Sequence, residues 1–253
     1  MALLGGMLNM KRVCFVTELL FAETRNLKHI RELLEQLMAE GPVECWFYKC
    51  CRPFAVQALE TIMEIRKERP DAELAVVDVV DPLETETENM DWSEQEECDF
   101  FPAGTVDRFI TAPVFAGKAG KNGQFVSTRW RKVNKWVWEQ CDCIAAYYYD
   151  DLLHDIAPRI KRTAEKKQIK LVHFYSKETE ALIKKKAKCL EGEDSILYNR
   201  RLKGDTFKEM AENMHAPLPS LISHTHKAIG KLYNLTVAEL RRQGKLYSSP
   251  FRP

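Results

Sequence analysis

Residues 11–175 alternate between short apolar runs and longer segments in which apolar residues recur at helical spacing. The first run, KRVCFVT at 11–17, is rich in β-branched and aromatic residues, which is typical of a strand buried on both faces of a parallel sheet. The runs predicted as strands are 11–17, 43–49, 73–80, 106–111, 143–149 and 169–175. The segments predicted as helices are 26–40, 53–69, 127–140, 156–167 and 178–190. This alternation predicts an α/β fold with a mostly parallel sheet and helices on both faces.

The last quarter of the chain shows three helical patterns in succession. The first carries Leu197 and ends at Gly204, and the second covers about 206–214, with Asp205 or Thr206 as its cap. After a break with two prolines, Ser220 is the expected cap of a third helix. The apolar face expected for that helix is Ile222, Thr225 or His226, Ile229 and Leu232. Two short helices joined by a tight turn form the helix-turn-helix arrangement.

Charge is distributed unevenly between this segment and the rest of the chain. Residues 194–253 hold ten Lys and Arg against five Asp and Glu, whereas residues 1–193 hold 28 against 32. Neutralisation of phosphates supplies most of the non-specific affinity for DNA. A basic C-terminal module on an acidic body therefore favours DNA binding.

The run ILYNRRLKGDTFKEMAENM, followed by PSLISHTHKAIGKL, resembles region four of bacterial sigma factors and the related LuxR-type modules. The resemblance covers about 45 residues and implies a helix-turn-helix that binds double-stranded DNA. Residues on its outer side that we expect to contact DNA are Arg200, Arg201, Lys203, Ser220, Ser223, His224, Lys227 and Lys231. The alternative is an ordinary three-helix packing or dimerisation domain.

The body, over most of residues 11–175, resembles the SLOG superfamily of Rossmann-like proteins. The matching segments are KRVCFVT, the run VECWFYKCCRPFAVQALETIMEIRKERPDAELAVV and the run RKVNKWVWEQCDCIAAYYYDD. The resemblance implies a nucleotide-derived ligand at the carboxyl ends of the strands, where open parallel sheets generally bind ligands. The residues that remain for such a pocket are Thr17, Lys49, Asn134 and Asp150.

The chain departs from this family at both glycine-rich loops. Residues 49–55, KCCRPFA, replace the first loop, and residues 150–155, DDLLHD, replace the second. Glycine lets a backbone approach a phosphate closely, which Cys, Arg and Pro do not, and two carboxylates at a strand end repel phosphate. We therefore expect a degenerate pocket and no cofactor.

An enzymatic reading would use the polar residues after the strand at 143–149, which are Asp150, Asp151, His154 and Asp155, with Lys49 or Cys50 facing them. Aspartates after a strand are more often helix caps, here for a helix that starts near Ile156. The sequence favours a non-enzymatic protein, and no catalytic residue is assigned.

Eight cysteines raise the question of a metal site or disulfides. No CxxC pair occurs, and His224 and His226 fall inside the third C-terminal helix, so no metal site is expected. Cysteines within apolar runs behave as small hydrophobic residues. No apolar run approaches the ~20 residues of a membrane span, and the first residues do not resemble a signal peptide. We expect a cytoplasmic protein with reduced thiols.

Three segments are predicted: a SLOG-like Rossmann domain at 11–177, a connecting helix at 178–192 and a helix-turn-helix DNA-binding domain at 193–253. The favoured function is DNA binding, as a transcriptional regulator whose α/β domain serves sensing or oligomerisation. The alternative is a SLOG-type protein that binds or processes nucleotides, with C-terminal helices that only pack or interact. Double-stranded DNA is the expected partner, and RNA polymerase, another protein and a nucleotide-derived small molecule are further candidates. We expect a homo-oligomer.

Overall fold

A parallel six-stranded sheet forms the centre of the α/β part of the protein. The computed structural model describes residues 10–50, 52–82, 101–102, 104–115, 125–153 and 156–248. The strands are β1 (Lys11–Val16), β2 (Val43–Phe47), β3 (Leu74–Val80), β4 (Arg108–Thr111), β5 (Cys143–Tyr147) and β6 (Lys170–Phe174). Their order is β4-β3-β2-β1-β5-β6, and every pairing is parallel. The order reverses between β1 and β5, where Val13 is paired with Cys45 on one side and Cys143 on the other.

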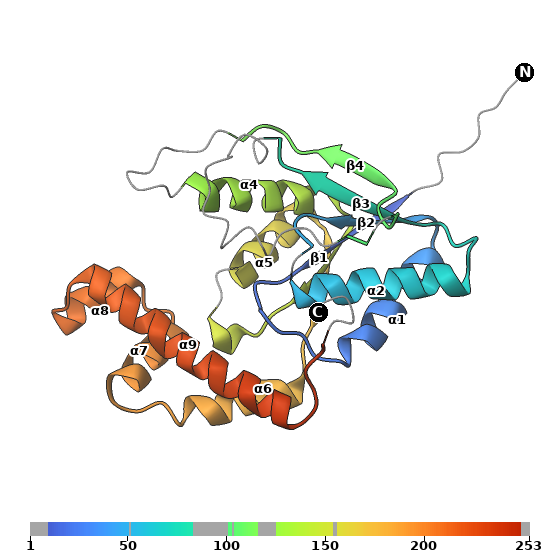
Figure 1. The fold of residues 1–253 in the computed structure, drawn as a ribbon. Coiled ribbons are helices and arrows are strands. Elements are labelled where there is room, and N and C mark those ends of the chain that lie inside the picture. The colour runs from blue at the N-terminus through green and yellow to red at the C-terminus, as the bar shows by residue number, and fades with distance from the viewer. Residues whose placement is uncertain are drawn as a thin grey trace, which may run out of the picture. The chain divides into compact units, whose positions relative to one another are not determined.

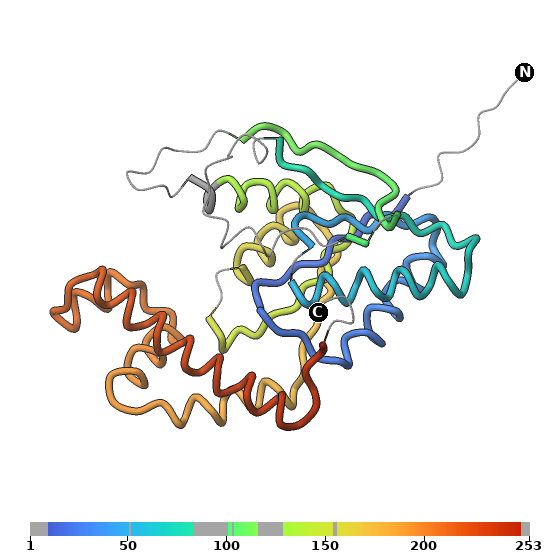
Figure 2. The backbone as a smooth tube through the Cα atoms, viewed as in Figure 1, coloured from blue at the N-terminus to red at the C-terminus, as the bar shows by residue number. Residues whose placement is uncertain are grey.

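Helices cover both faces of this sheet (Figures 1 and 2). The helices α1 (Asn26–Met38) and α2 (Pro53–Glu68) lie on one face, and α4 (Phe125–Gln140) and α5 (Ile156–Lys167) lie on the other. Aromatic rings fill the first layer, where Phe54 of α2 stacks on Tyr147 of β5 at 5.3 Å between ring centroids. These features confirm the predicted fold class.

The chain divides into two compact units. One contains residues up to Tyr147 together with Pro158–Phe174, and the other contains Tyr148–Ala157 together with Tyr175–Tyr247. The second unit consists of the short helix η1 (Asp150–Leu152) and four α-helices. These helices are α6 (Lys177–Ala187), α7 (Gly192–Leu202), α8 (Phe207–Met214) and α9 (Leu218–Arg242).

The helix α6 packs within the helical unit rather than serving only as a connection. Its Lys186 lies 3.5 Å from Glu239 of α9, and Lys245 lies 2.8 Å from Glu178 at the other end of α6. The two helices therefore run antiparallel.

The buried face of α9 differs from the one predicted. The helix begins at Leu218 with Pro217 as its N-cap, so Ser220 lies inside the helix and is exposed. The buried residues of its first half are Leu221, Thr225, Ala228 and Leu232, whereas Ile222 and Ile229 are half-buried and His226 is exposed. The predicted Thr225 and Leu232 are buried, whereas Leu221 and Ala228 take the places expected for Ile222 and Ile229. The Thr225 hydroxyl is buried at little cost because it donates to the Leu221 carbonyl at 2.8 Å.

Candidate nucleic-acid interface

The connection between α8 and α9 is a tight turn with well-defined ends. Thr206 caps α8, and the predicted capping box is present: the Thr206 hydroxyl accepts from the Glu209 backbone, while the Glu209 carboxylate accepts from the Thr206 backbone at 2.7 Å. His215 ends α8 in the left-handed conformation, with φ 50. Pro219 lies in the first turn of α9, where a backbone N–H is not required.

A small apolar core holds α7, α8 and α9 together. It consists of Leu197 from α7, Met210 from α8 and Leu221 from α9, all buried. Phe207 and Met214 of α8 pack against this core. One side of α9 is therefore buried against α7 and α8.

The opposite side of α9 carries a continuous exposed row of residues that we call the outward stripe. The stripe consists of Ser220, Ser223, Lys227, Asn234 and Arg241, which are exposed, together with the half-buried Gly230. These positions recur at spacings of three, four and seven residues, so they share one face over ~32 Å at 1.5 Å per residue. The stripe contains small, polar and cationic residues and no carboxylate. The helical spacing of apolar residues continues in the sequence beyond Leu232. The sequence alone could therefore have predicted that the helix reaches Asn234 and Arg241.

Two of the predicted DNA-contacting residues face an acidic turn instead. Lys231 Nζ lies 3.2 Å from Asp194 Oδ2, and His224 Nδ1 lies 3.6 Å from Glu193 Oε1. Both carboxylates belong to the first turn of α7, where acids also favour the helix dipole. By contrast, no described residue pairs with the exposed side chain of Lys227.

The basic residues at the end of α7 are placed differently from one another. The guanidinium of Arg201 lies 4.5 Å above the Phe207 ring and also donates to the Asp205 carbonyl. Arg200 is half-buried, with its Nη1 3.9 Å from Asp205. Lys203 is exposed. Lys203 is therefore the most accessible of the three charges, and Arg201 mainly stabilises the turn before α8.

The residues predicted for a ligand pocket make contacts within the α/β unit or, for Asp150, belong to the helical unit. The Thr17 hydroxyl donates to the Tyr147 carbonyl at 2.8 Å and accepts from the Leu19 backbone at 3.0 Å, which ties β1 to β5. Asn134 donates to the Trp130 carbonyl of its own helix. Lys49 has a left-handed backbone, with φ 57, and its ammonium lies 5.9 Å from the Tyr48 ring centroid. Asp150 belongs to the helical unit, in η1.

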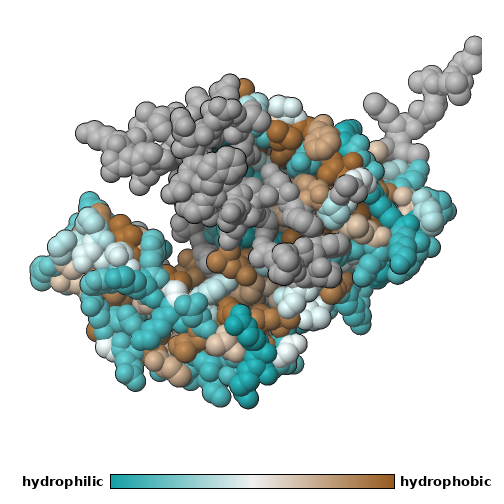
Figure 3. Space-filling model, in the orientation of Figure 1, coloured by the Kyte–Doolittle hydropathy of each residue, from teal (hydrophilic) through white to brown (hydrophobic). Residues whose placement is uncertain are grey.

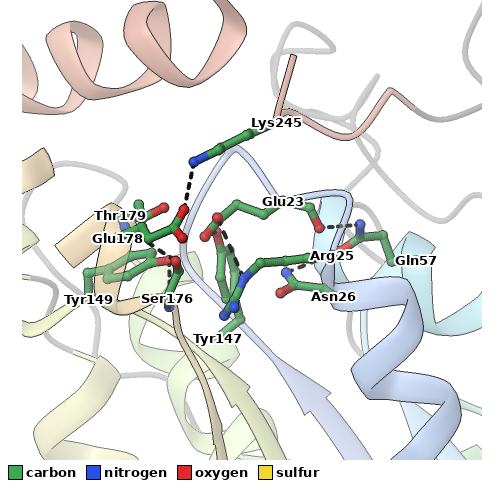
Figure 4. A network of polar contacts seen from close by, with 10 residues as sticks. All are labelled: Glu23, Arg25, Asn26, Gln57, Tyr147, Tyr149, Ser176, Glu178, Thr179 and Lys245. Atoms are coloured by element: carbon green, nitrogen blue, oxygen red, sulfur yellow. Dashed lines mark hydrogen bonds and ion pairs between the residues drawn. The ribbon is translucent and has the colours of Figure 1, made fainter. Parts of the chain in front are cut away.

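A buried polar network lies at the carboxyl ends of β1 and β5, within the α/β unit (Figure 4). Tyr147 donates to Glu23 Oε1 at 3.3 Å, and Gln57 Nε2 donates to the Glu23 carbonyl at 2.9 Å. This orients Gln57 Oε1 toward Asn26, whose Nδ2 donates to it at 3.4 Å. Asn26 Oδ1 is then left buried without a hydrogen-bond partner among the described residues. The sequence pattern did not indicate this network, because its residues come from segments far apart along the chain.

Of the residues weighed for catalysis, Asp151 makes a structural contact in the helical unit. Lys184 lies between Glu180, at 2.6 Å, and Asp151, at 3.8 Å. Burial raises the pKa of Asp151, and the nearby Lys184 partly opposes this increase. In the same unit the Ser176 backbone donates to the Tyr149 hydroxyl at 3.1 Å, as Figure 4 shows. His154 and Asp155 lie outside the described residues.

The described ranges contain neither a metal-binding cluster nor a membrane-spanning helix. No group of three or more His, Cys, Asp or Glu side chains in them could hold a metal ion. Within those ranges no helix is long and apolar enough to span a bilayer.

In the view of Figure 3, hydrophilic residues cover much of the surface of α8 and α9.

Comparison with known proteins gives no close relative. No protein-family model and no curated protein matches the chain. Among solved structures, the low-resolution structure of the response regulator StyR has 11% identity and a TM-score of 0.20, covering 91% of this chain and 99% of that chain. The structure of two RcsB dimers bound to two parallel DNAs has 12% identity and a TM-score of 0.17, covering 92% and 98%. Similarity at this level supports no inference about the protein.

Proposed function

We propose that the protein binds double-stranded DNA through the outward stripe of α9 and acts as a transcriptional regulator. The observation that carries this proposal is the composition of the stripe. Along ~32 Å of helix it presents serines, an asparagine, a lysine and an arginine without a carboxylate. A solvated helix face usually mixes acids with bases, whereas a face that meets phosphates does not.

The geometry of the α8–α9 turn supports a helix in the major groove, which is wide enough to admit one. In a helix-turn-helix the early residues of the second helix face base edges. Ser220 and Ser223 occupy these positions, and their small side chains let the helix approach the bases closely. Lys227 follows one turn later with an unpaired charge, and Arg241 lies ~21 Å further along the helix, where it would meet backbone phosphate.

For the α/β unit we propose a role in ligand sensing or in oligomerisation, as in a degenerate SLOG-like domain. The unpaired Asn26 Oδ1 favours a small molecule with a hydrogen-bond donor as the sensed ligand, because a buried acceptor without a partner is costly. We also propose that the protein forms a homo-oligomer, is cytoplasmic and contacts RNA polymerase or another protein.

The test is a salt titration of DNA binding by the full chain and its Lys227→Gln variant. One phosphate contact contributes a slope of about −0.9 in the plot of log affinity against log salt. We expect the variant to bind all DNA sequences more weakly by the same factor. Its salt dependence should be less steep, with a slope about 0.9 smaller in magnitude. The measurement is fluorescence anisotropy with a labelled duplex of mixed sequence.

Lys188→Gln is the matched control. Lys188 is also exposed and unpaired among the described residues, but it lies at the carboxyl end of α6, outside the stripe. An equal loss in both variants would show a diffuse charge effect and contradict the stripe as the interface. Absence of binding by the full chain at low salt would leave the C-terminal helices as a packing or interaction domain.

A further inference from the structure

The basic side chains of α9 differ in their neighbours. Arg242 pairs with Glu239 of the same helix, and the others fall into two groups. Lys227 and Arg241 lie on the outward stripe with no paired carboxylate among the described residues. Lys231 and His224 lie beside the stripe, next to Asp194 and Glu193 respectively. We call Glu193 and Asp194 the acidic turn of α7.

We propose that the acidic turn of α7 determines from which side DNA can approach α9. It neutralises Lys231, lies beside His224 and repels phosphate from that side, so that DNA contacts the Lys227 side of the helix. This inference rests on the proposed function and defines the electrostatics of the same surface.

The physical basis is the charge of the acidic turn rather than the strength of its ion pairs. Lys231 and Asp194 are 55% and 33% exposed, and exposed ion pairs are weak. A phosphate that approached Lys231 would, however, also come close to the Asp194 carboxylate, which belongs to a helix fixed by the buried Leu197. A cation that is already neutralised by a carboxylate gains little from a phosphate. Lys231 therefore contributes little to DNA affinity in the natural protein.

The acidic turn also restricts orientation. A helix with cations on several sides could bind phosphate through any of them, so its rotation about its own axis against the DNA would not be defined. Like charges across an interface suppress wrong arrangements more than they change the right one. With Glu193 and Asp194 on one side, only the stripe side remains attractive, and Ser220 and Ser223 are on that side.

The test is a double-mutant cycle with Asp194→Asn, Lys231→Gln and the combination of both. DNA binding is measured by fluorescence anisotropy on a mixed-sequence duplex between about 50 and 200 mM salt. Asp194→Asn should raise the affinity for all sequences and steepen the salt slope by about 0.9, because Lys231 becomes available for a phosphate. That slope corresponds to an affinity that falls about 3.5-fold further over this salt range.

Lys231→Gln alone should change the affinity less than about twofold, because the lost charge is compensated by Asp194, but it should abolish the gain in the Asp194→Asn background. Glu191→Gln is the control, because Glu191 is the exposed N-cap residue of α7 and has no contact with α9 among the described residues. Its effect should be smaller and independent of Lys231. Circular dichroism and thermal melting establish that each variant is folded.

An equal loss on Lys231→Gln in both backgrounds would overturn the inference, as would the absence of a gain in Asp194→Asn. In either case binding by the natural protein would leave the proposed function intact. Failure of the natural protein itself to bind would overturn both.

Discussion

The phenol oxygen of Tyr198 on α7 donates a hydrogen bond to the backbone carbonyl of Asp151, at a distance of 3.0 Å. This bond joins η1 to the helices of the second unit and explains why residues 148–157 group with α6–α9 rather than with the sheet. We expect Tyr198→Phe to lower the free energy of unfolding by about 1 kcal/mol, the usual net value of one hydrogen bond. Urea unfolding followed by circular dichroism measures this, and an unchanged midpoint would show that the bond does not stabilise the unit.

The same tyrosine predicts a loss of stability at alkaline pH. Burial, followed by the nearby Asp151, raises the pKa of Tyr198 to about 12. The unfolded chain has an ordinary tyrosine pKa of about 10, so the unfolded state loses this proton first. The contribution to stability is therefore complete below pH ~10 and is lost between pH ~10 and ~12, at up to about 1.4 kcal/mol per pH unit. Tyr198→Phe should flatten this dependence in unfolding experiments across the same pH range.

The cysteines should differ sharply in their reaction with an alkylating agent. Burial raises the pKa of the Cys143 thiol to about 12, and it also raises the pKa values of Cys14 and Cys45. Because the thiolate is the reactive form, these three should remain unmodified in the folded protein, whereas the exposed Cys189 should react. Mass spectrometry after brief alkylation measures this, with the urea-unfolded protein as control. Rapid labelling of Cys45 in the folded state would contradict it.

Glu44 on β2 should be important for stability because it is a buried carboxylate with three partners. It accepts a hydrogen bond from Trp46 Nε1 at 3.1 Å, and Arg12 and Arg108 lie against it. We expect Glu44→Ala to cost about 1–3 kcal/mol, since it leaves the donors of its partners unsatisfied. Glu44→Gln should cost less, because it retains an acceptor for Trp46.

The matched control for Glu44 is Glu64→Ala, which removes an exposed acid paired with Arg31. Exposed ion pairs contribute about 0–1 kcal/mol, so the control should remain close to the natural protein. Equal melting temperatures for Glu44→Ala and Glu64→Ala would refute the prediction.

The segment after β2 predicts that common nucleotide cofactors do not bind. The SLOG resemblance implies a glycine-rich loop after β2, where this chain has Lys49 and Pro53, and Pro53 begins α2 without a backbone N–H to donate. We expect no saturable heat on calorimetric titration with NAD or with nucleoside monophosphates in the micromolar range. Clear saturation with either ligand would contradict this and would make Thr17 and Asn134 the first residues to mutate.

Ser223 should affect sequence preference rather than overall affinity, because it is exposed on the outward stripe in the first half of α9, where a recognition helix faces base edges. His224 faces the acidic turn of α7 and should have little effect on preference. Loss of a direct base contact costs about 1–3 kcal/mol at the preferred site and leaves binding to other sites unchanged. Selection from a random pool of duplexes, followed by comparison of Ser223→Ala and His224→Ala with the natural protein, measures this. Identical preferences of Ser223→Ala and the natural protein would argue against a base contact by Ser223.

The sequence by itself determined the local structure of most of this protein. Runs rich in apolar residues and bounded by turn residues located β1, β2 and β5 with at most two extra residues at one end, because a strand covered on both faces buries most of its side chains. Of the two caps predicted for α8, Asp205 and Thr206, the structure has Thr206, whose capping box with Glu209 depends only on residues three apart.

Only the tertiary structure decided which side of α9 is buried. A helix pattern defines a broad apolar face, and the choice of Leu221 and Ala228 over Ile222 and Ile229 depends on the helices that pack against α9. The ion pair of Lys231 with Asp194 likewise joins residues 37 positions apart, which no local spacing indicates. The place of Asp151 in the helical unit depends on Tyr198 in the same way. Periodicity reports the environment along one element, whereas these features depend on distances between elements, which packing of the whole chain sets.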